Sequence, residues 1–339
     1  MSTVSKRVRR RPILSVLALA LLGIALVFAM GGRPAAGAPA VVAHVRTVRA
    51  AASPTVPSAA AKSELTTAKA VVLGLVEGIT EFLPVSSTGH LHIAEQLMNV
   101  GKSPATKDAM DSYTVIIQVG AIAAVLLISW RRIIEVFQGL IGRSVQGRKL
   151  LFALAAAFVP AAAIGVVLDK AIGDHLLKTA PIAAAWIVGG VAILLFGPKY
   201  RTAQRSGRAL ESLTVREGAI IGVAQALALW PGVSRSLVTI LAAIVIGLSL
   251  EAAVEFSFLL GLLTLGAATV YKLGKDGSLV FDTYGKTSPL IGIAVAFVSA
   301  AIAVKWMIAY LHRHDLTVFA GYRIIIGVAA LGLMATTLL

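Results

Sequence analysis

Cysteine is absent from this sequence, and charged residues are scarce. Without cysteine, neither a disulfide nor a thiolate metal site can form. Charged residues make up 14% of the 339 positions and hydrophobic residues 58%, whereas soluble domains carry roughly a quarter charged residues. Uncharged runs cover 13–30, 113–130, 150–168, 181–197, 218–234, 236–250, 256–271, 289–304 and 324–339. Most of them approach the roughly 17–25 residues that a helix needs to cross a bilayer. The composition indicates a polytopic helical membrane protein and excludes a secreted or nucleic-acid-binding globule.

The net charge of +15 sets orientation in the membrane rather than binding to a nucleic acid. Segments 131–149 and 198–216 each hold five Lys or Arg against one acid, whereas 169–180 is balanced. By the positive-inside rule, the two basic segments are cytoplasmic and the balanced one is external. This predicts a multi-pass membrane protein whose two basic segments face the cytoplasm. The expected crossings are 113–130, 150–168, 181–197, 254–271, 289–311 and 318–338.

Residues 1–64 are predicted to lie outside the membrane domain of the protein. Residues 1–30 combine a basic start with the uncharged run 13–30, which predicts a signal anchor, with a cleaved signal peptide as the alternative. Residues 31–64 are rich in Ala and Pro and are typical of a disordered tether. We therefore expect the functional membrane domain at 65–339.

Two apolar segments are interrupted by polar residues and proline. Segment 70–94 contains Glu77 and Glu81, and segment 217–250 contains Arg235. When the chain is shifted by 148 positions, several residues around the two interruptions coincide, while the loop charges give the two segments opposite orientation. These features predict an inverted repeat with paired broken helices. The expected fold is an all-α membrane protein with six transmembrane helices and two re-entrant helix hairpins.

The tips of the two hairpins have the composition of an anion site. Ser86 or Ser87 in the first hairpin and Ser234 in the second are candidate helix caps, which would direct the N–H groups of 87–90 and 235–237 into a cavity. Helix N-termini bind anions, phosphate above all, and the fork of Arg235 suits phosphate oxygens. Further hydroxyls come from Thr88, Ser236 and Thr239.

Acidic and imidazole groups lie beside this predicted anion site. Glu77 and Glu81 share one helix face, and two carboxylates next to a phosphate suit a divalent cation such as Mg²⁺ or Ca²⁺. His90 is a candidate acid, base or nucleophile. Together these groups predict phosphoryl transfer. The alternatives are a structural buried ion pair for the charged groups and a packing role for His90. We assign structural roles to His92, Glu255 and Arg323.

Two strings resemble a known family. They are Glu-Gly-Ile-Thr-Glu-Phe-Leu-Pro-Val-Ser-Ser-Thr-Gly-His at 77–90 and Pro-Gly-Val-Ser-Arg-Ser at 231–236. Both resemble the undecaprenyl-diphosphatase, or bacitracin-resistance, family, from about residue 65 to the end. The resemblance implies hydrolysis of undecaprenyl diphosphate to the monophosphate and inorganic phosphate, which recycles the lipid carrier for peptidoglycan synthesis and lowers sensitivity to bacitracin. Its functional positions fall on Glu77, Glu81, Ser87, His90 and Arg235, with a divalent cation.

The resemblance has one departure and leaves some questions open. Leu237 stands where the family usually has glycine, so we expect a narrower cavity beside the phosphate. Either Ser87 or His90 could be the nucleophile. The expected partners are the polyprenyl diphosphate substrate and membrane lipid, with a homodimer allowed and no nucleic acid. The rival function is a transporter or flippase of a phosphorylated lipid or another anion, since inverted repeats with broken helices also build transporters.

Overall fold

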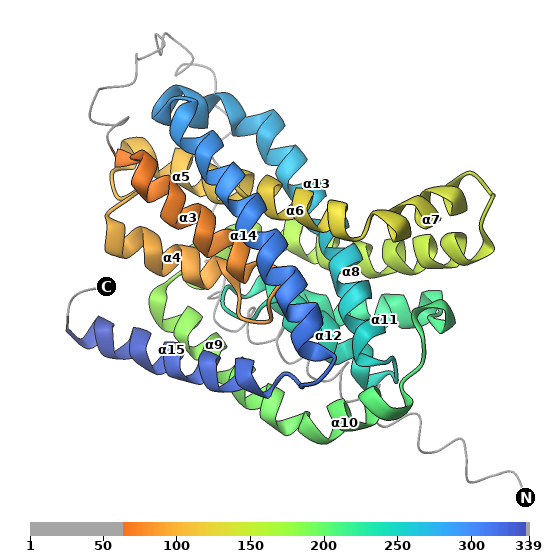
Figure 1. Cartoon of the computed structure of the whole chain (residues 1–339). Coiled ribbons are helices and arrows are strands. Elements are labelled where there is room, and N and C mark those ends of the chain that lie inside the picture. The colour runs from red at the N-terminus through yellow and green to blue at the C-terminus, as the bar shows by residue number, and fades with distance from the viewer. Residues whose placement is uncertain (1–63, 337–339) are drawn as a thin grey trace, which may run out of the picture.

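The computed structural model describes residues 64–336, which form helices and connecting turns (Figure 1). Within that range no β-strand forms, and one isolated bridge joins Arg208 and Leu248. The segments expected at 1–30 and 31–64 lie outside the described residues, apart from Glu64. The helices are α3 (Thr67–Thr80), α4 (Ser87–Met98), α5 (Pro104–Ile116), α6 (Gln118–Ile128), α7 (Trp130–Leu140), α8 (Val145–His175), α9 (Thr179–Leu195), α10 (Gly197–Ser206), η1 (Leu210–Ser212), α11 (Val215–Gln225), η2 (Ala226–Leu229), α12 (Arg235–Val245), α13 (Leu250–Tyr284), α14 (Thr287–Leu311) and α15 (Thr317–Ala335).

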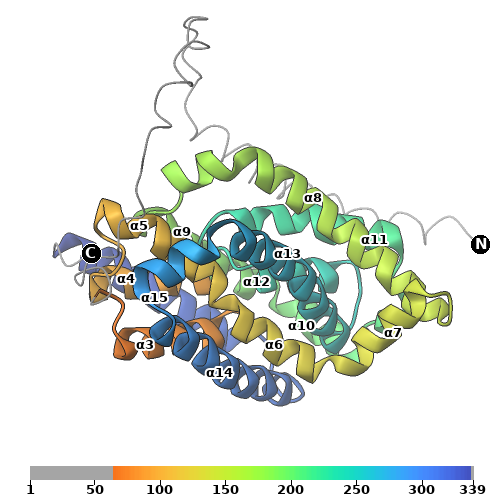
Figure 2. The ribbon, with the colours of Figure 1, turned by 90° about the horizontal axis from the view of Figure 1, so that it is seen from above.

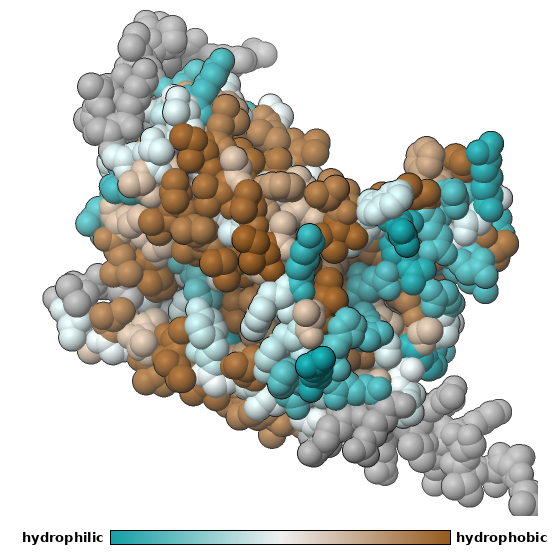
Figure 3. All heavy atoms as spheres, viewed as in Figure 1, coloured by the Kyte–Doolittle hydropathy of each residue, from teal (hydrophilic) through white to brown (hydrophobic). Residues whose placement is uncertain are grey.

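Five helical stretches of the described chain are long and apolar enough to cross a membrane: Pro104–Ile128, Val145–Leu168, Leu250–Tyr284, Thr287–Leu311 and Thr317–Ala335. The sixth expected crossing, 181–197, corresponds to the shorter apolar helix α9, which has 17 residues. Apolar side chains dominate the surface over α3 and α14, whereas hydrophilic residues gather near the turn between α7 and α8 (Figure 3). The chain is therefore a multi-pass helical membrane protein.

Helix α13 is longer than the crossing expected at 254–271. It continues to Tyr284 and so includes the charged residues Lys272 and Asp276. These two side chains form an ion pair at 2.9 Å, one helical turn apart, and Ser112 of α5 donates a hydrogen bond to Asp276 at 3.2 Å. Because the charges are satisfied along the helix and by a neighbouring helix, they do not end it.

The two broken helices are present and share an unusual backbone. Ser86 and Ser234, 148 positions apart, directly precede α4 and α12 and have φ of 73° and 76°, with ψ of 101° and 115°. Positive φ is uncommon for residues other than glycine. The same rare conformation at equivalent positions supports the repeat that the sequence predicts.

The two halves of the repeat exchange their hairpins. Helix α3 of the first half packs on α14 of the second, and α11 of the second half packs on α8 of the first. Seen from above, α8 and α14 lie on opposite sides of the bundle with α13 between them (Figure 2). Gly74 and Gly222, again 148 positions apart, make these contacts close. A Cβ on Gly74 would lie 2.4 Å from the carbonyl oxygen of Gly292, and one on Gly222 would lie 2.3 Å from that of Ala157.

A fully buried arginine joins the two breaks. Arg323 of α15 donates hydrogen bonds to the carbonyl oxygens of Pro84 at 3.1 Å and Gly232 at 2.9 Å, which belong to the first and second breaks. It also donates to the carbonyls of Ala185 at 3.0 Å and Val233 at 3.2 Å. Buried backbone that leaves a helix needs such partners, because its carbonyl groups no longer bond within the helix.

Substituting Gly222 with alanine tests the close approach of α11 and α8. The added Cβ must displace backbone, so we expect Gly222→Ala to destabilise the protein by about 1–3 kcal/mol. Gly266→Ala in α13 is the matched control, because a Cβ there meets nothing within 4 Å. Thermal unfolding of both variants in detergent measures the difference, and equal midpoints would contradict the packing.

Removing the guanidinium of Arg323 tests its hold on the two breaks. Arg323→Met leaves buried carbonyls without a donor, so we expect a loss of roughly 2–5 kcal/mol in the free energy of unfolding. Arg313→Met removes an exposed arginine from the turn before α15 and serves as the control. Denaturant titration in detergent provides the comparison, and a wild-type midpoint for Arg323→Met would refute the role.

Candidate active site

The two breaks meet in one polar site, as the repeat predicts. The side chain of Ser236, from the second break, donates a hydrogen bond to the carbonyl oxygen of Leu83 in the first at 2.9 Å. Arg235 Nη2 lies 3.1 Å from Glu81 Oε1. Both side chains of this ion pair are largely buried, with 12% and 6% of their area exposed. Interactions between these opposite charges are therefore screened little by solvent.

Glu81 connects the arginine to a serine hydroxyl. Its Oε1 pairs with Arg235, and its Oε2 accepts a hydrogen bond from the hydroxyl of Ser87. Arg235 is further fixed by a bond from Nη1 to the carbonyl oxygen of Ser257 at 3.0 Å and by the ring of Phe82, whose centre is 5.3 Å from Cζ. The structure thus aligns a hydroxyl, a carboxylate and a guanidinium across the two breaks.

Glu77 lies one turn before Glu81 and is fully buried. Both of its carboxylate oxygens lack a hydrogen-bond partner within the described part of the chain. An isolated buried carboxylate is costly, and a cation or a proton would relieve that cost. In residues 64–336 no group of three or more His, Cys, Asp or Glu could hold a metal ion. The two unbonded oxygens of Glu77 are therefore the feature of this site that a cation would have to use.

His90 is held by both ring nitrogens. Nδ1 is 2.7 Å from the carbonyl oxygen of Ser86, and Nε2 is 2.8 Å from the hydroxyl of Tyr322. The rings of His90 and Tyr322 are stacked, with centres 5.7 Å apart, and the ring of Trp186 lies 4.9 Å from that of His90. His92 contacts the hydroxyl of Thr179 at 3.3 Å, in keeping with the structural role expected for it.

The capping groups at the two breaks differ. Ser234 caps α12 by accepting from the N–H of Leu237 at 3.3 Å, whereas Ser86 makes no side-chain cap to α4. The N–H of His90 is likewise engaged, donating to the Ser86 carbonyl at 3.4 Å. The N–H groups of Leu237 and His90, which we expected to face the cavity, therefore donate within the first turn of their own helices instead.

The candidate hydroxyls are placed unequally. Thr239 is fully buried and contacts the hydroxyl of Ser257 at 2.7 Å, and it donates to the carbonyl of Arg235 at 2.9 Å. Ser234 and Ser236 contact each other at 3.0 Å. Thr88 lies on the exposed side of the first turn of α4. Leu237, which we expected to narrow the cavity, is buried in the main hydrophobic core.

Sequence reasoning missed the contribution of α15. Arg323 was expected to have a general structural role, and Tyr322 carried no expectation, yet both reach the hairpin tips. The one sequence feature that could have indicated this contribution is the adjacent Tyr322-Arg323 pair within a largely apolar segment. Because the pair lies more than 200 residues from His90, the sequence does not indicate that they are in contact.

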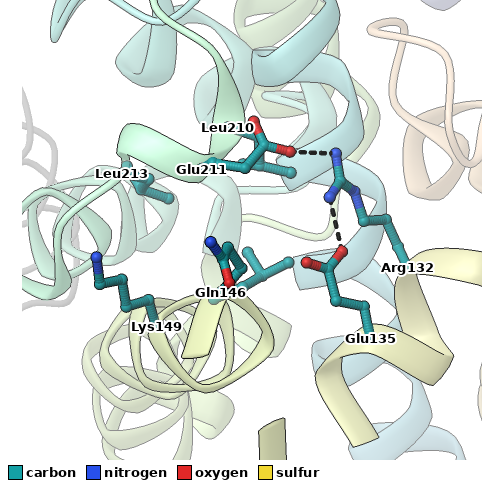
Figure 4. A pocket seen from close by; sticks show the side chains of 8 residues that line it. Arg132, Glu135, Gln146, Lys149, Leu210, Glu211 and Leu213 are labelled. Atoms are coloured by element: carbon teal, nitrogen blue, oxygen red, sulfur yellow. Dashed lines mark hydrogen bonds and ion pairs between the residues drawn. The ribbon is translucent and has the colours of Figure 1, made fainter. Parts of the chain in front are cut away.

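A surface cavity away from the two breaks involves a separate set of charges (Figure 4). Arg132 of α7 pairs with Glu135 at 2.7 Å, with Glu211 at 2.7 Å and with Glu255 at 2.8 Å. The hydrogen bonds that Arg132 donates to these carboxylates, first of all to that of Glu255, raise the pKa of Arg132. The cluster joins α7, η1 and α13, and it explains Glu255 as a structural residue. Its lining also includes Gln146, Lys149, Leu150, Leu210 and Leu213.

Comparison with known proteins agrees with this geometry. Residues 70–329 match the family described as bacitracin resistance protein BacA. The chain is 44% identical over 264 residues to undecaprenyl-diphosphatase 2 of Rhodospirillum rubrum, covering 78% of this chain and 93% of the relative. It is 40% identical to undecaprenyl-diphosphatases of Sorangium cellulosum, covering 78% and 85% of the two chains, and of Deinococcus deserti, covering 79% and 95%. With its two strings at 77–90 and 231–236 inside the matched range, this chain belongs to the BacA family of bacitracin resistance proteins.

Proposed function

We propose that this protein is a membrane phosphatase that hydrolyses undecaprenyl diphosphate to undecaprenyl phosphate and inorganic phosphate. Relatives that are 40–44% identical over most of the chain carry the name undecaprenyl-diphosphatase. The activity recycles the lipid carrier for cell-wall synthesis and gives bacitracin resistance. The rival function, a transporter or flippase, is not favoured, because these relatives are named for a phosphatase.

The contact of Ser87, Glu81 and Arg235 is the observation that carries this proposal. A hydroxyl bonded to a carboxylate is a nucleophile beside a base, and a guanidinium on the same carboxylate is a ready ligand for phosphate oxygens. The three groups come from the two opposed breaks and are buried. Such an arrangement suits phosphoryl transfer, where positioning and charge neutralisation supply most of the catalysis.

In the first step, Arg235 binds oxygens of the terminal phosphate. Glu81 takes the proton of Ser87 as Oγ forms a bond to the terminal phosphorus, and the bond from that phosphorus to the bridging oxygen breaks. Undecaprenyl phosphate leaves with the electron pair. We favour Ser87 over His90 as nucleophile because the Ser87 hydroxyl already contacts a base, whereas Nε2 of His90 faces Tyr322.

In the second step, water releases the phosphate from Ser87. His90 Nε2 accepts a proton from the water as the water oxygen bonds to phosphorus. The bond from phosphorus to Oγ breaks, and the proton held by Glu81 returns to Ser87. The base must carry a lone pair, and the bond from Nδ1 to the Ser86 carbonyl leaves that lone pair on Nε2, where the water takes the place of the Tyr322 hydroxyl.

Glu77 and Glu81 are the residues that would hold a divalent cation, Mg²⁺ or Ca²⁺. The buried, unpartnered oxygens of Glu77 support this assignment. The ion would neutralise charge on the phosphate oxygens. The hydroxyls of Ser86, Thr88, Ser234, Ser236 and Thr239 are proposed substrate-binding groups around the same site.

We further propose six crossings, with α3–α4 and α11–α12 as re-entrant hairpins in the cytoplasmic membrane. The basic residues of 131–149 and 198–216 support a cytoplasmic position for α7 and α10, which places the ends of the first hairpin outside. The site then opens toward the outer side, and the polyprenyl tail stays in lipid. A homodimer remains a prediction.

Substitution of Arg235 or Glu81 tests the assigned roles. Arg235→Ala and Glu81→Gln remove a phosphate ligand and a base, so we expect kcat to fall by about 10²–10³-fold. Phosphate release from undecaprenyl diphosphate by the purified protein in detergent is the measurement. Glu251→Gln, at a side chain that is 76% exposed, is the control.

Two outcomes of this assay are informative. Normal turnover by either variant would overturn the roles of these residues. Detergent removes any gradient, so failure of the wild-type protein to release phosphate would favour the transporter instead.

Chelation tests the cation. We expect EDTA to abolish phosphate release and Mg²⁺ or Ca²⁺ to restore it, because two buried carboxylates are a poor phosphate site without a positive ion. The same ions should raise the thermal midpoint of the wild-type protein by selective binding to the folded state. Glu77→Gln should lose that shift and Glu251→Gln should keep it. Full activity in EDTA would exclude the requirement.

A further inference from the structure

Helix α15 places a phenol directly on the imidazole of His90. The hydroxyl of Tyr322 is 2.8 Å from Nε2, and the two rings are nearly parallel, at 6°. Tyr322 is 42% exposed, so it does not fill the core. Its contact with a site residue therefore needs an explanation other than packing.

The hydrogen bonds of His90 fix which nitrogen carries the proton. A carbonyl oxygen can only accept, so the 2.7 Å contact with the Ser86 carbonyl requires a hydrogen on Nδ1. In the neutral ring, Nε2 then holds the lone pair and accepts the hydrogen of the Tyr322 hydroxyl. The backbone of the first break and the phenol of α15 together fix the tautomer and the orientation of the ring.

Tyr322 is itself fixed relative to the site by its neighbour in sequence. Arg323 donates to the carbonyl oxygens of Pro84 and Gly232, which belong to the two breaks. The residue that ties α15 to both hairpin tips thus stands next to the residue that contacts His90. The position of the Tyr322 hydroxyl in the site is consequently fixed by the hydrogen bonds of Arg323.

We propose that Tyr322 is a positioning residue for His90 in the reaction. Its hydroxyl holds Nε2 in the orientation from which it accepts a proton, and it occupies the place that water takes during turnover. This inference rests on the proposed function.

The variant Tyr322→Phe tests the contribution of the hydroxyl separately from that of the stacked ring. It keeps the aromatic ring, so we expect kcat to fall on the order of tenfold, the loss of one hydrogen bond, while KM changes less than about twofold. In a His90→Gln background, the same change should have no further effect, because Tyr322 acts through His90. Tyr310→Phe is the matched control, since Tyr310 stacks on His314 away from the site.

A second measurement does not depend on turnover. Nitrogen chemical shifts of ¹⁵N-labelled His90 should report the Nδ1-protonated ring in the wild-type protein, and the Nε2 resonance should move in Tyr322→Phe. Wild-type kcat for Tyr322→Phe, or the same fall in the His90→Gln background, would overturn the inference. Absence of phosphate release by the wild-type protein would instead overturn the proposed function.

Discussion

Buried backbone that leaves a helix must find its hydrogen bonds elsewhere in the protein, and the rest of this structure follows from that constraint. Two breaks create such backbone, and the carbonyl oxygens of each are met by side chains from distant helices. Trp186 of α9 donates to the carbonyl of Val85 at 2.9 Å, and Ser236 to that of Leu83. Arg323 of α15 serves both breaks at once. The side chains that donate hydrogen bonds to the backbone of the breaks also hold the two breaks together, and the candidate site lies where the two breaks meet.

The charges of the site reinforce this arrangement. Arg235 and Glu81 belong to opposite breaks and are both largely buried, so each would be costly without the other. Their pairing holds the guanidinium near Ser87, and within residues 64–336 neither carboxylate oxygen of Glu77 has a hydrogen bond. A buried carboxyl group close to a guanidinium, where the two breaks meet, is the feature on which the proposed binding of a cation and a phosphate depends.

Much of this could be predicted from the sequence, because scarce charge makes each buried charge informative. The two broken segments, the 148-residue offset and the meeting of Arg235 with the first break all followed from patterns along the chain. The length of α13 could not be predicted, because Lys272 and Asp276 in the sequence indicate the end of an apolar run. In the structure they pair with each other, and Ser112 bonds Asp276, so the helix continues. The contacts of Tyr322 could not be predicted either, since sequence periodicity indicates which face of a helix a residue lies on but not which distant residue that face contacts. Of the two serines expected to cap α4, Ser86 makes no side-chain cap and the Ser87 hydroxyl bonds Glu81 instead, because local motifs do not specify side-chain rotamers.

The exchange of hairpins between the two halves has a consequence for synthesis of the protein. Helix α3 leaves the ribosome about 200 residues before α14, on which it packs. At roughly 5–20 residues per second, the first hairpin waits on the order of 10–40 s with its polar tip unmatched. For most of that interval Glu81 lacks its ion-pair partner, because Arg235 lies about 150 residues further along the chain. The nascent chain must therefore keep its first hairpin near water, or bound to the insertion machinery, until α12 and α14 have been made.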